Sequence, residues 1–265
     1  MDDHVRDHVR RTLERIEESE AVRVVYACES GSRAWGFESS DSDYDVRFLY
    51  VRPRDWYLSI DLERKRDVVE LPVDPVWDFS GWDIRKALQL LHNSNPALLE
   101  WLGSPLVYSD DVRFSSALQE LAVKCHSPKS LTQHYFRMAE RNWQACVRGD
   151  TVTAKKYLYV VRPLLATRWV LEGRGLPPVR FETVLANMEI DPALRLALEE
   201  LIRRKRTQAE KDAESRIPAI DDFCQKETAH LSELVREVPH ESRCDADQFS
   251  REFRALLGVF DGDES

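Results

Sequence analysis

Apolar positions in the first eighty residues follow two different periods. Val5, Val9, Leu13 and Ile16 recur every three or four residues among charged side chains, which predicts an amphipathic helix. The segments that follow are short, apolar and rich in β-branched and aromatic residues, as is typical of buried strands. Strands are predicted at residues 22–28, 46–51, 67–71 and 76–79, separated by Gly, Ser and Pro.

The period becomes helical from Asp83 onward. Ile84, Leu88 and Leu91 lie on one helix face, and Asn95-Pro96 is a capping residue followed by a proline suited to the first turn of the next helix. Further helices are predicted near residues 113–126, 129–148, 153–172, 191–213 and 221–236. We therefore predict an α+β protein with a small mixed sheet and flanking helices in residues 1–106, followed by an all-helical C-terminal domain in residues 107–265.

Composition narrows the class of protein. With 265 residues and 43% apolar content the chain can bury a substantial core. A net charge of −9 argues against a protein that coats nucleic acid without specificity, because such binding needs a broad field of Lys and Arg. A net negative charge is still compatible with a basic groove confined to one part of the surface.

The cysteines and the hydropathy indicate the compartment. The five cysteines are odd in number, widely spaced and free of CxxC pairs, which favours reduced thiols. The chain has no run of about 18 apolar residues and no apolar leader at its start. We expect a soluble, cytoplasmic protein with no membrane partner.

Two aspartates open the predicted strand at residues 46–51. Side chains two apart on a strand point to the same face, so Asp43 and Asp45 emerge together. Paired carboxylates are hard oxygen ligands suited to Mg²⁺, which commonly binds one or two carboxylates plus substrate phosphates. Asp-x-Asp also occurs elsewhere in this acidic chain, and an isolated copy is usually a solvated loop. The position of this pair at the start of a strand distinguishes it.

A Gly-Ser pair ends the preceding strand. Gly31 permits positive φ and close backbone approach, so successive N–H groups and the Ser32 hydroxyl can point at phosphate oxygens. The alternative is an ordinary turn between a strand and a helix. Arg33 suits a phosphate clamp or an ion pair with Asp41, and the sequence does not decide between them.

A third acid is expected on a neighbouring strand. Asp78 lies between two aromatic residues on a short strand, where a buried carboxylate needs a partner such as a metal. Glu70 is the alternative third carboxylate. Asp83 is explained more simply as the N-terminal residue of a helix.

These motifs together resemble the DNA polymerase β-like nucleotidyltransferase superfamily. More narrowly they are similar to a bacterial and phage family of predicted nucleotidyltransferases associated with RNA ligase and RNA end repair. The resemblance is strong over roughly residues 20–110. It is carried by residues 31–37 (GSRAWGF), 42–48 (SDYDVRF), 78–87 (DFSGWDIRKA) and 94–102 (SNPALLEWL), and continues more loosely into residues 155–165 (KKYLYVVRPLL).

The resemblance implies a transferase that binds ATP or another NTP and, with Mg²⁺ or Mn²⁺, transfers a nucleoside monophosphate and releases pyrophosphate. Asp43, Asp45 and Asp78 would be the catalytic and metal-binding residues, and Gly31 and Ser32 would bind the outer phosphates. The implied setting is RNA repair, with an RNA end as acceptor and RNA-repair proteins as partners.

Basic side chains in the helical half add to this picture. Lys155, Tyr159 and Arg162 fall on one face of a predicted helix, where they suit a triphosphate and a stacked base. The alternative is a solvated face whose tyrosine covers apolar surface. The run 203–206 (RRKR) would contact RNA phosphates or, as is more usual, pair with nearby glutamates.

The acceptor stays open at this stage. Besides an RNA end, it would be a protein side chain or a small molecule. A rival of another class is a noncatalytic module that binds RNA or a partner protein, which the intact Gly-Ser and Asp-x-Asp pairs oppose.

Overall fold

The computed structural model describes residues 2–72, 74–147, 149, 151–207, 213–239 and 244–262. The chain divides into two compact units. The first unit comprises residues 1–31, 43–126 and 242–265, and the second comprises residues 32–42 and 127–241. The chain therefore crosses from one unit to the other four times.

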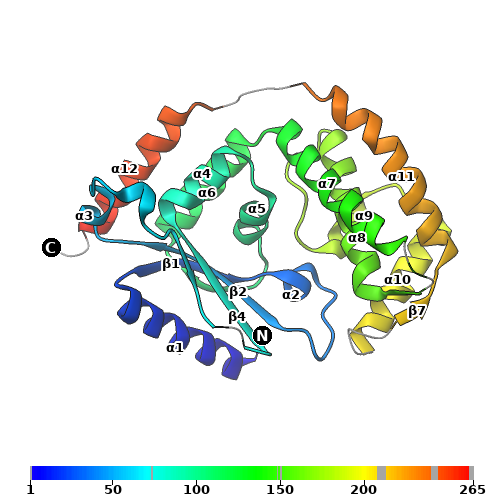
Figure 1. Cartoon of the computed structure of the whole chain (residues 1–265), viewed down its shortest axis with the longest axis horizontal. Helices are drawn as coiled ribbons and strands as arrows, with labels where there is room; N and C mark the ends of the chain where they lie inside the picture. Colours follow the sequence, from blue (N-terminus) through cyan, green and yellow to red (C-terminus); the bar gives the residue numbers. More distant parts are fainter. Residues whose placement is uncertain are drawn as a thin grey trace. The chain divides into compact units, whose positions relative to one another are not determined.

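The first unit is built on a five-stranded mixed sheet (Figure 1). Its strand order is β3-β4-β2-β1-β5, in which β2 and β4 are parallel and the other neighbours are antiparallel. The strands are β1 (Arg23–Glu29), β2 (Tyr44–Val51), β3 (Val68–Glu70), β4 (Trp77–Asp83) and β5 (Val107–Asp110).

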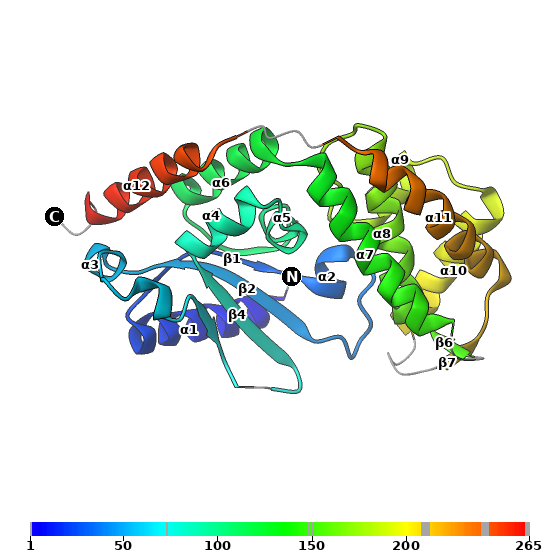
Figure 2. The same cartoon turned by 45° about the horizontal axis from the view of Figure 1, so that its top comes forward.

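Helices cover both faces of this sheet. Figure 2 shows α1 (Asp3–Glu20) on one face and α4 (Ile84–His92), α5 (Pro96–Leu102) and α6 (Val112–Cys125) on the other. Val9, Leu13 and Ile16 of α1 pack against alternate residues of the strands, among them Val46 and Phe48. This period-two burial places the intervening residues of β2 on the opposite face. The short elements α3 (Arg54–Tyr57) and η1 (Leu62–Arg64) connect β2 to β3.

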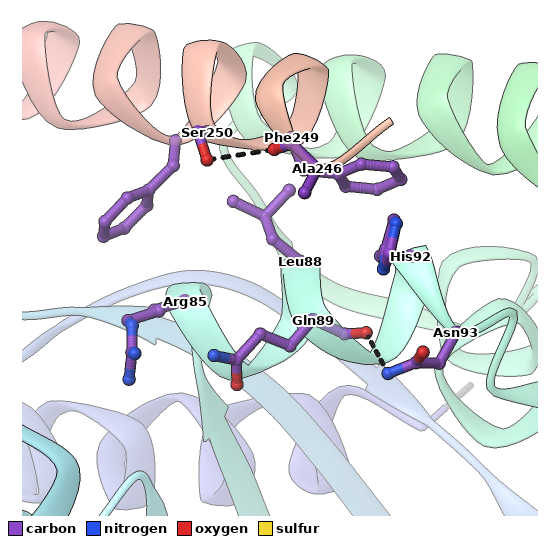
Figure 3. A pocket seen from close by; sticks show the side chains of 9 residues that line it. Arg85, Leu88, Gln89, His92, Asn93, Ala246, Phe249 and Ser250 are labelled. Atoms are coloured by element: carbon purple, nitrogen blue, oxygen red, sulfur yellow. Dashed lines mark hydrogen bonds between the residues drawn. The ribbon is translucent and has the colours of Figure 1, made fainter. Parts of the chain in front are cut away.

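The last helix, α12 (Ala246–Gly262), returns to the first unit and packs against α4 and α6. Phe249 meets His92 of α4 edge to face at 5.0 Å, and Phe253 meets Tyr57 at 5.2 Å. A groove of about 310 Å³ remains between α4 and α12, with Leu88 between the two helices (Figure 3).

A disulfide joins Cys125, the last residue of α6, to Cys244 just before α12. The prediction that all five cysteines are free thiols is therefore wrong for this pair. The two residues are 119 positions apart in sequence, so their proximity depends on the return of α12 and leaves no local signal. Cys28, Cys146 and Cys224 are free and buried.

The second unit is largely helical. Its helices are α7 (Pro128–Cys146), α8 (Ala154–Leu171), α9 (Phe181–Asn187), α10 (Pro192–Thr207) and α11 (Pro218–Glu237). They enclose a core to which Phe37, from the segment 32–42, also contributes. A two-stranded antiparallel sheet of β6 (Thr151–Thr153) and β7 (Ala213–Ser215) is an addition to the predicted all-helical arrangement.

The predicted α+β class is confirmed, since a mixed sheet with flanking helices precedes a largely helical region. The compact units differ from the predicted division at residue 106, because β5 and α6 pack with the sheet and α12 returns to it. No described helix has the length and apolar character needed to cross a membrane.

Candidate active site

Two of the predicted acids face each other across the parallel strands. Asp45 on β2 and Asp78 on β4 are Cα partners. Arg47, which shares the face of Asp45, donates from Nη2 to Asp45 Oδ1 at 3.0 Å and to Asp78 Oδ2 at 2.7 Å. Its Nη1 also donates to the carbonyl oxygen of Asp78 at 3.0 Å. The two carboxylates therefore share one cationic group at the start of both strands.

Asp43 directly precedes β2, and its side chain is exposed. Its spacing from Asp45 is that of side chains on one face of an extended segment. Within the described part of the chain, no group of three or more His, Cys, Asp or Glu side chains is arranged to hold a metal ion. The three predicted carboxylates are therefore not a ready-made ligand cluster.

The donor chemistry nevertheless fits a divalent cation. Asp43, Asp45 and Asp78 offer hard carboxylate oxygens, and the Arg47 guanidinium already shows that Asp45 and Asp78 together attract a positive group. A cation held by these two carboxylates would compete with that guanidinium.

Glu70 and Asp83 have other surroundings. Glu70, on the edge strand β3, is the Cα partner of Ser80, and its carboxylate pairs with Arg66 at 3.3 Å. Asp83 is the N-cap of α4, as predicted for a helix N-terminal residue, and accepts from the Arg85 N–H and the Tyr57 hydroxyl, each at 2.8 Å. Burial raises the pKa of Asp83 to about 6.

Gly31 opens the short helix α2 (Gly31–Trp35) with a positive φ of 59°. A Cβ at this position would stand 2.0 Å from Asp45 Oδ2, so any other residue would force the Asp45 carboxylate to move. The preceding Ser30 N–H donates to the Asp45 carbonyl at 2.8 Å. The Gly-Ser turn is thus in direct contact with the residue predicted to bind metal.

Ser32 and Arg33 belong to the segment 32–42 of the second unit. Ser32 is buried, and its carbonyl accepts the N–H groups of Gly36 and Phe37. Arg33 donates from Nη2 to the carbonyl of Ser42 at 2.7 Å, which closes the loop that leads to Asp43.

The predicted stripe on α8 also lies in the second unit. The Arg162 guanidinium is 4.3 Å from the ring centroid of Trp35, and Tyr159 meets the same ring edge to face at 5.3 Å. The Lys155 ammonium lies 5.9 Å from the Tyr159 ring centroid. Arg162 is only 7% exposed, so the stripe is in part a packed surface against α2 and not a fully solvated face.

The basic run at the end of α10 forms mainly internal contacts. Arg203 and Arg204 both pair with Glu200, which supports the ion-pair interpretation for these two residues. Lys205 is 2% exposed and lies 5.6 Å from the Phe37 ring centroid. Arg206 pairs with Glu182 at 2.7 Å.

Two further residues belong to the acidic site and were not predicted from the sequence. Arg47 had a signal, because it lies two residues beyond Asp45 on the same strand face. Glu29, at the end of β1, is 1% exposed; its carboxylate accepts the Asp45 N–H at 2.8 Å and the Tyr108 hydroxyl. The only indication of Glu29 in the sequence is its position, as an acidic residue at the end of an apolar strand and two residues before Gly31.

The chain matches a family model and is similar to known proteins. Residues 5–255 match the family model described as "RlaP: RNA repair pathway DNA polymerase beta family". The chain is 42% identical over 247 residues to "Uncharacterized protein YcgL" of Bacillus subtilis (strain 168), which covers 93% of each protein. A crystal structure of a nucleotidyltransferase-like protein from Exiguobacterium sibiricum 255-15 is 12% identical, with a TM-score of 0.34 over 85% of this chain and 74% of that one.

Proposed function

Since the chain belongs to the RNA repair pathway DNA polymerase beta family, we propose that it is a divalent-metal-dependent nucleotidyltransferase. In the proposed reaction an acceptor hydroxyl of an RNA end attacks the α-phosphorus of an NTP. The bond from that phosphorus to the bridging oxygen breaks, and pyrophosphate leaves. ATP is one candidate donor among the NTPs.

The observation that carries this proposal is the pairing of Asp45 and Asp78 around one cationic group, beside Gly31. Carboxylates from adjacent strands next to a glycine turn suit phosphoryl chemistry, in which catalysis is mostly positioning and electrostatics. Asp43, Asp45 and Asp78 would hold Mg²⁺ or Mn²⁺. When bound, the cation neutralises negative charge that develops on the reacting phosphates.

The chain's own side chains have distinct roles in this proposal. Asp78 takes the proton of the attacking hydroxyl. An acceptor can reach it more easily than Asp45, since 56% of its side chain is accessible against 31% for Asp45. Arg47 neutralises Asp45 and Asp78 in the absence of metal, and a bound cation would take over that role. Glu29 fixes Asp45 through the backbone N–H.

Nucleotide binding is assigned to two groups of residues. The backbone of Gly31, the Ser32 hydroxyl and the Arg33 guanidinium bind the outer phosphates. On α8, the Lys155 and Arg162 cations bind phosphate oxygens, and Tyr159 stacks on the base. Within the second unit, Arg162 and Tyr159 both contact Trp35, the last residue of α2, so the α8 cations lie near the end of the segment that carries Ser32 and Arg33.

Calorimetry of NTP binding with and without Mg²⁺ tests this assignment. We expect Mg²⁺ to strengthen binding of at least one NTP to the full chain, and Asp45→Asn and Asp78→Asn to remove that effect. Glu70→Gln is the matched control, because Glu70 is the other candidate third carboxylate and its carboxylate pairs with Arg66. If Glu70→Gln removes the Mg²⁺ effect and Asp78→Asn does not, the third carboxylate is Glu70.

Calorimetry combined with a labelling assay that uses α-labelled NTPs separates the rival classes. A noncatalytic module predicts RNA or protein binding with no Mg²⁺-dependent NTP affinity. Transfer to a protein or a small molecule predicts Mg²⁺-dependent NTP binding with labelled product only when a cell lysate or that small molecule is present.

A further inference from the structure

Gly36 of the second unit is in contact with two arginine side chains. Arg206 of α10 donates from Nη2 to the Gly36 carbonyl at 2.6 Å. Arg180, which precedes α9, lies close to the α-carbon of Gly36, since a Cβ at position 36 would stand 2.8 Å from its Nη1. Gly36 has a φ of 87°, which favours glycine, and its missing side chain leaves the space in which the Arg180 guanidinium lies.

The positive charge around this turn is large. The neighbours of Gly36 each carry a cation over their ring, Arg162 over Trp35 and Lys205 over Phe37. Arg206 forms an ion pair with Glu182 at 2.7 Å, so the Glu182 carboxylate offsets the charge of Arg206. An anion bound by both guanidinium groups would offset their like charge.

The charge of Arg180 is not balanced by any contact within the described part of the fold. Within the described ranges its guanidinium has no hydrogen bond and no ion pair, although it is half-buried. It is also the N-cap of α9 without a side-chain cap bond, and a cation at that end of a helix opposes the helix dipole. A bound anion would stabilise this half-buried guanidinium at the N-terminus of α9, because it would supply the negative charge that the protein does not.

The geometry points to a phosphate-binding site at Gly36, formed by the guanidinium groups of Arg180 and Arg206. Arginine is suited to this ligand because its planar fork of N–H donors matches the oxygens of a phosphate. Which molecule carries this phosphate depends on the proposed function. A nucleotidyltransferase that acts on RNA binds two phosphate-bearing molecules, the NTP with its triphosphate and the RNA acceptor with its backbone. Both present the same oxyanion chemistry.

Binding of two probes to the full chain tests the site. The probes are ATP, followed by calorimetry, and a short fluorescent single-stranded RNA, followed by anisotropy at several salt concentrations. Arg180→Gln weakens one of them about tenfold, as expected for the loss of a charge-assisted hydrogen bond. If that probe is RNA, the slope of log affinity against log salt concentration falls by about 0.7. Arg180→Lys restores part of the affinity because the charge stays and the fork is lost.

Arg203→Gln is the matched control, because it removes one arginine of the same region whose partner is Glu200. It should leave both affinities unchanged, and thermal unfolding of every variant checks the fold. The site is overturned if Arg180→Gln binds both probes like the wild type, if Arg203→Gln weakens binding equally, or if the wild type binds neither probe.

The failure of this site and the failure of the proposed function give different results. If Asp45→Asn removes the Mg²⁺ effect on ATP binding while Arg180→Gln changes nothing, only the phosphate site is lost. If RNA affinity depends on Arg180 while ATP binding is indifferent to Mg²⁺ and to Asp45, the site stands and the nucleotidyltransferase assignment does not.

Discussion

Gly31 and Asp45 are in such close contact that a Cβ on Gly31 would stand 2.0 Å from a carboxylate oxygen of Asp45. The first residue of the Gly-Ser turn therefore limits where the Asp45 side chain lies. A substitution at position 31 has two separable effects. A residue other than glycine loses stability at a positive φ, and its Cβ collides with the Asp45 carboxylate.

Gly31→Ala should weaken Mg²⁺-dependent NTP binding about tenfold or more, because Asp45 has to move from its place. The positive φ alone costs about 1–2 kcal/mol of the free energy of unfolding. Gly173→Ala is the control for that cost, since Gly173 has a φ of 71° and nothing within 4 Å of its Cβ position. Calorimetry and urea unfolding of both variants check this, and equal NTP affinities would contradict the role of the contact.

Arg47→Gln should make the protein more responsive to metal. Without the guanidinium, Asp45 and Asp78 repel each other, and stability in the absence of metal falls by about 0.5–1 kcal/mol, the range for partly exposed pairs. Added Mg²⁺ then binds without displacing a competitor, so the rise in melting temperature on adding Mg²⁺ is larger than in the wild type. An identical rise in both proteins would show that Arg47 and the cation do not share these carboxylates.

Asp83 should make stability depend on pH between about pH 4 and 6. Burial raises its pKa from 3.8 to about 6, so the folded protein holds this proton more tightly than the unfolded chain. The contribution of Asp83 is therefore fully present below pH 4 and is lost as the pH rises through 6, with an upper limit of about 3 kcal/mol.

Asp83→Asn isolates this effect, because asparagine keeps a capping oxygen and does not ionise. The difference in free energy of unfolding, wild type minus variant, should decrease from pH 4 to pH 7 in urea titrations. Parallel curves for the two proteins would rule out a raised pKa at this position.

The disulfide predicts a defined thiol count. The protein denatured without reductant should have three alkylatable thiols, those of Cys28, Cys146 and Cys224, and five after reduction. The double variant Cys125→Ser, Cys244→Ser should be less stable by about 2–4 kcal/mol, since a long closed loop constrains the unfolded chain. Five reactive thiols without reductant would show that the pair is not bonded.

Strongly periodic segments were predictable from the sequence, and weak or non-local features were not. The strands at Val22 to Cys28 and Val46 to Val51 and the long helices agree with the structure because their burial follows one clear period. The strand β5 was not predicted because it has only four residues and none of them is fully buried. The strands β6 and β7 have three residues each and pair across sixty positions, where no local pattern records the pairing.

The acidic site was predictable in its residue types but not in its pairing. Alternation on β2 placed Asp43 and Asp45 on one face, and the aromatic neighbours of Asp78 singled it out. The parallel register that makes Asp45 and Asp78 partners depends on two strands that are far apart in sequence. The ion pairs of Arg47 follow from that register, so they became visible only with the structure.

Incubation of the full chain with each α-labelled NTP, Mg²⁺ and single-stranded RNA tests the central claim most directly. The account predicts label on the RNA, an equal amount of pyrophosphate, and neither product from the Asp43→Asn, Asp45→Asn variant. Label that appears only on protein from an added lysate would contradict RNA as the acceptor. Pyrophosphate release by the double variant at the wild-type rate would contradict the carboxylate site itself.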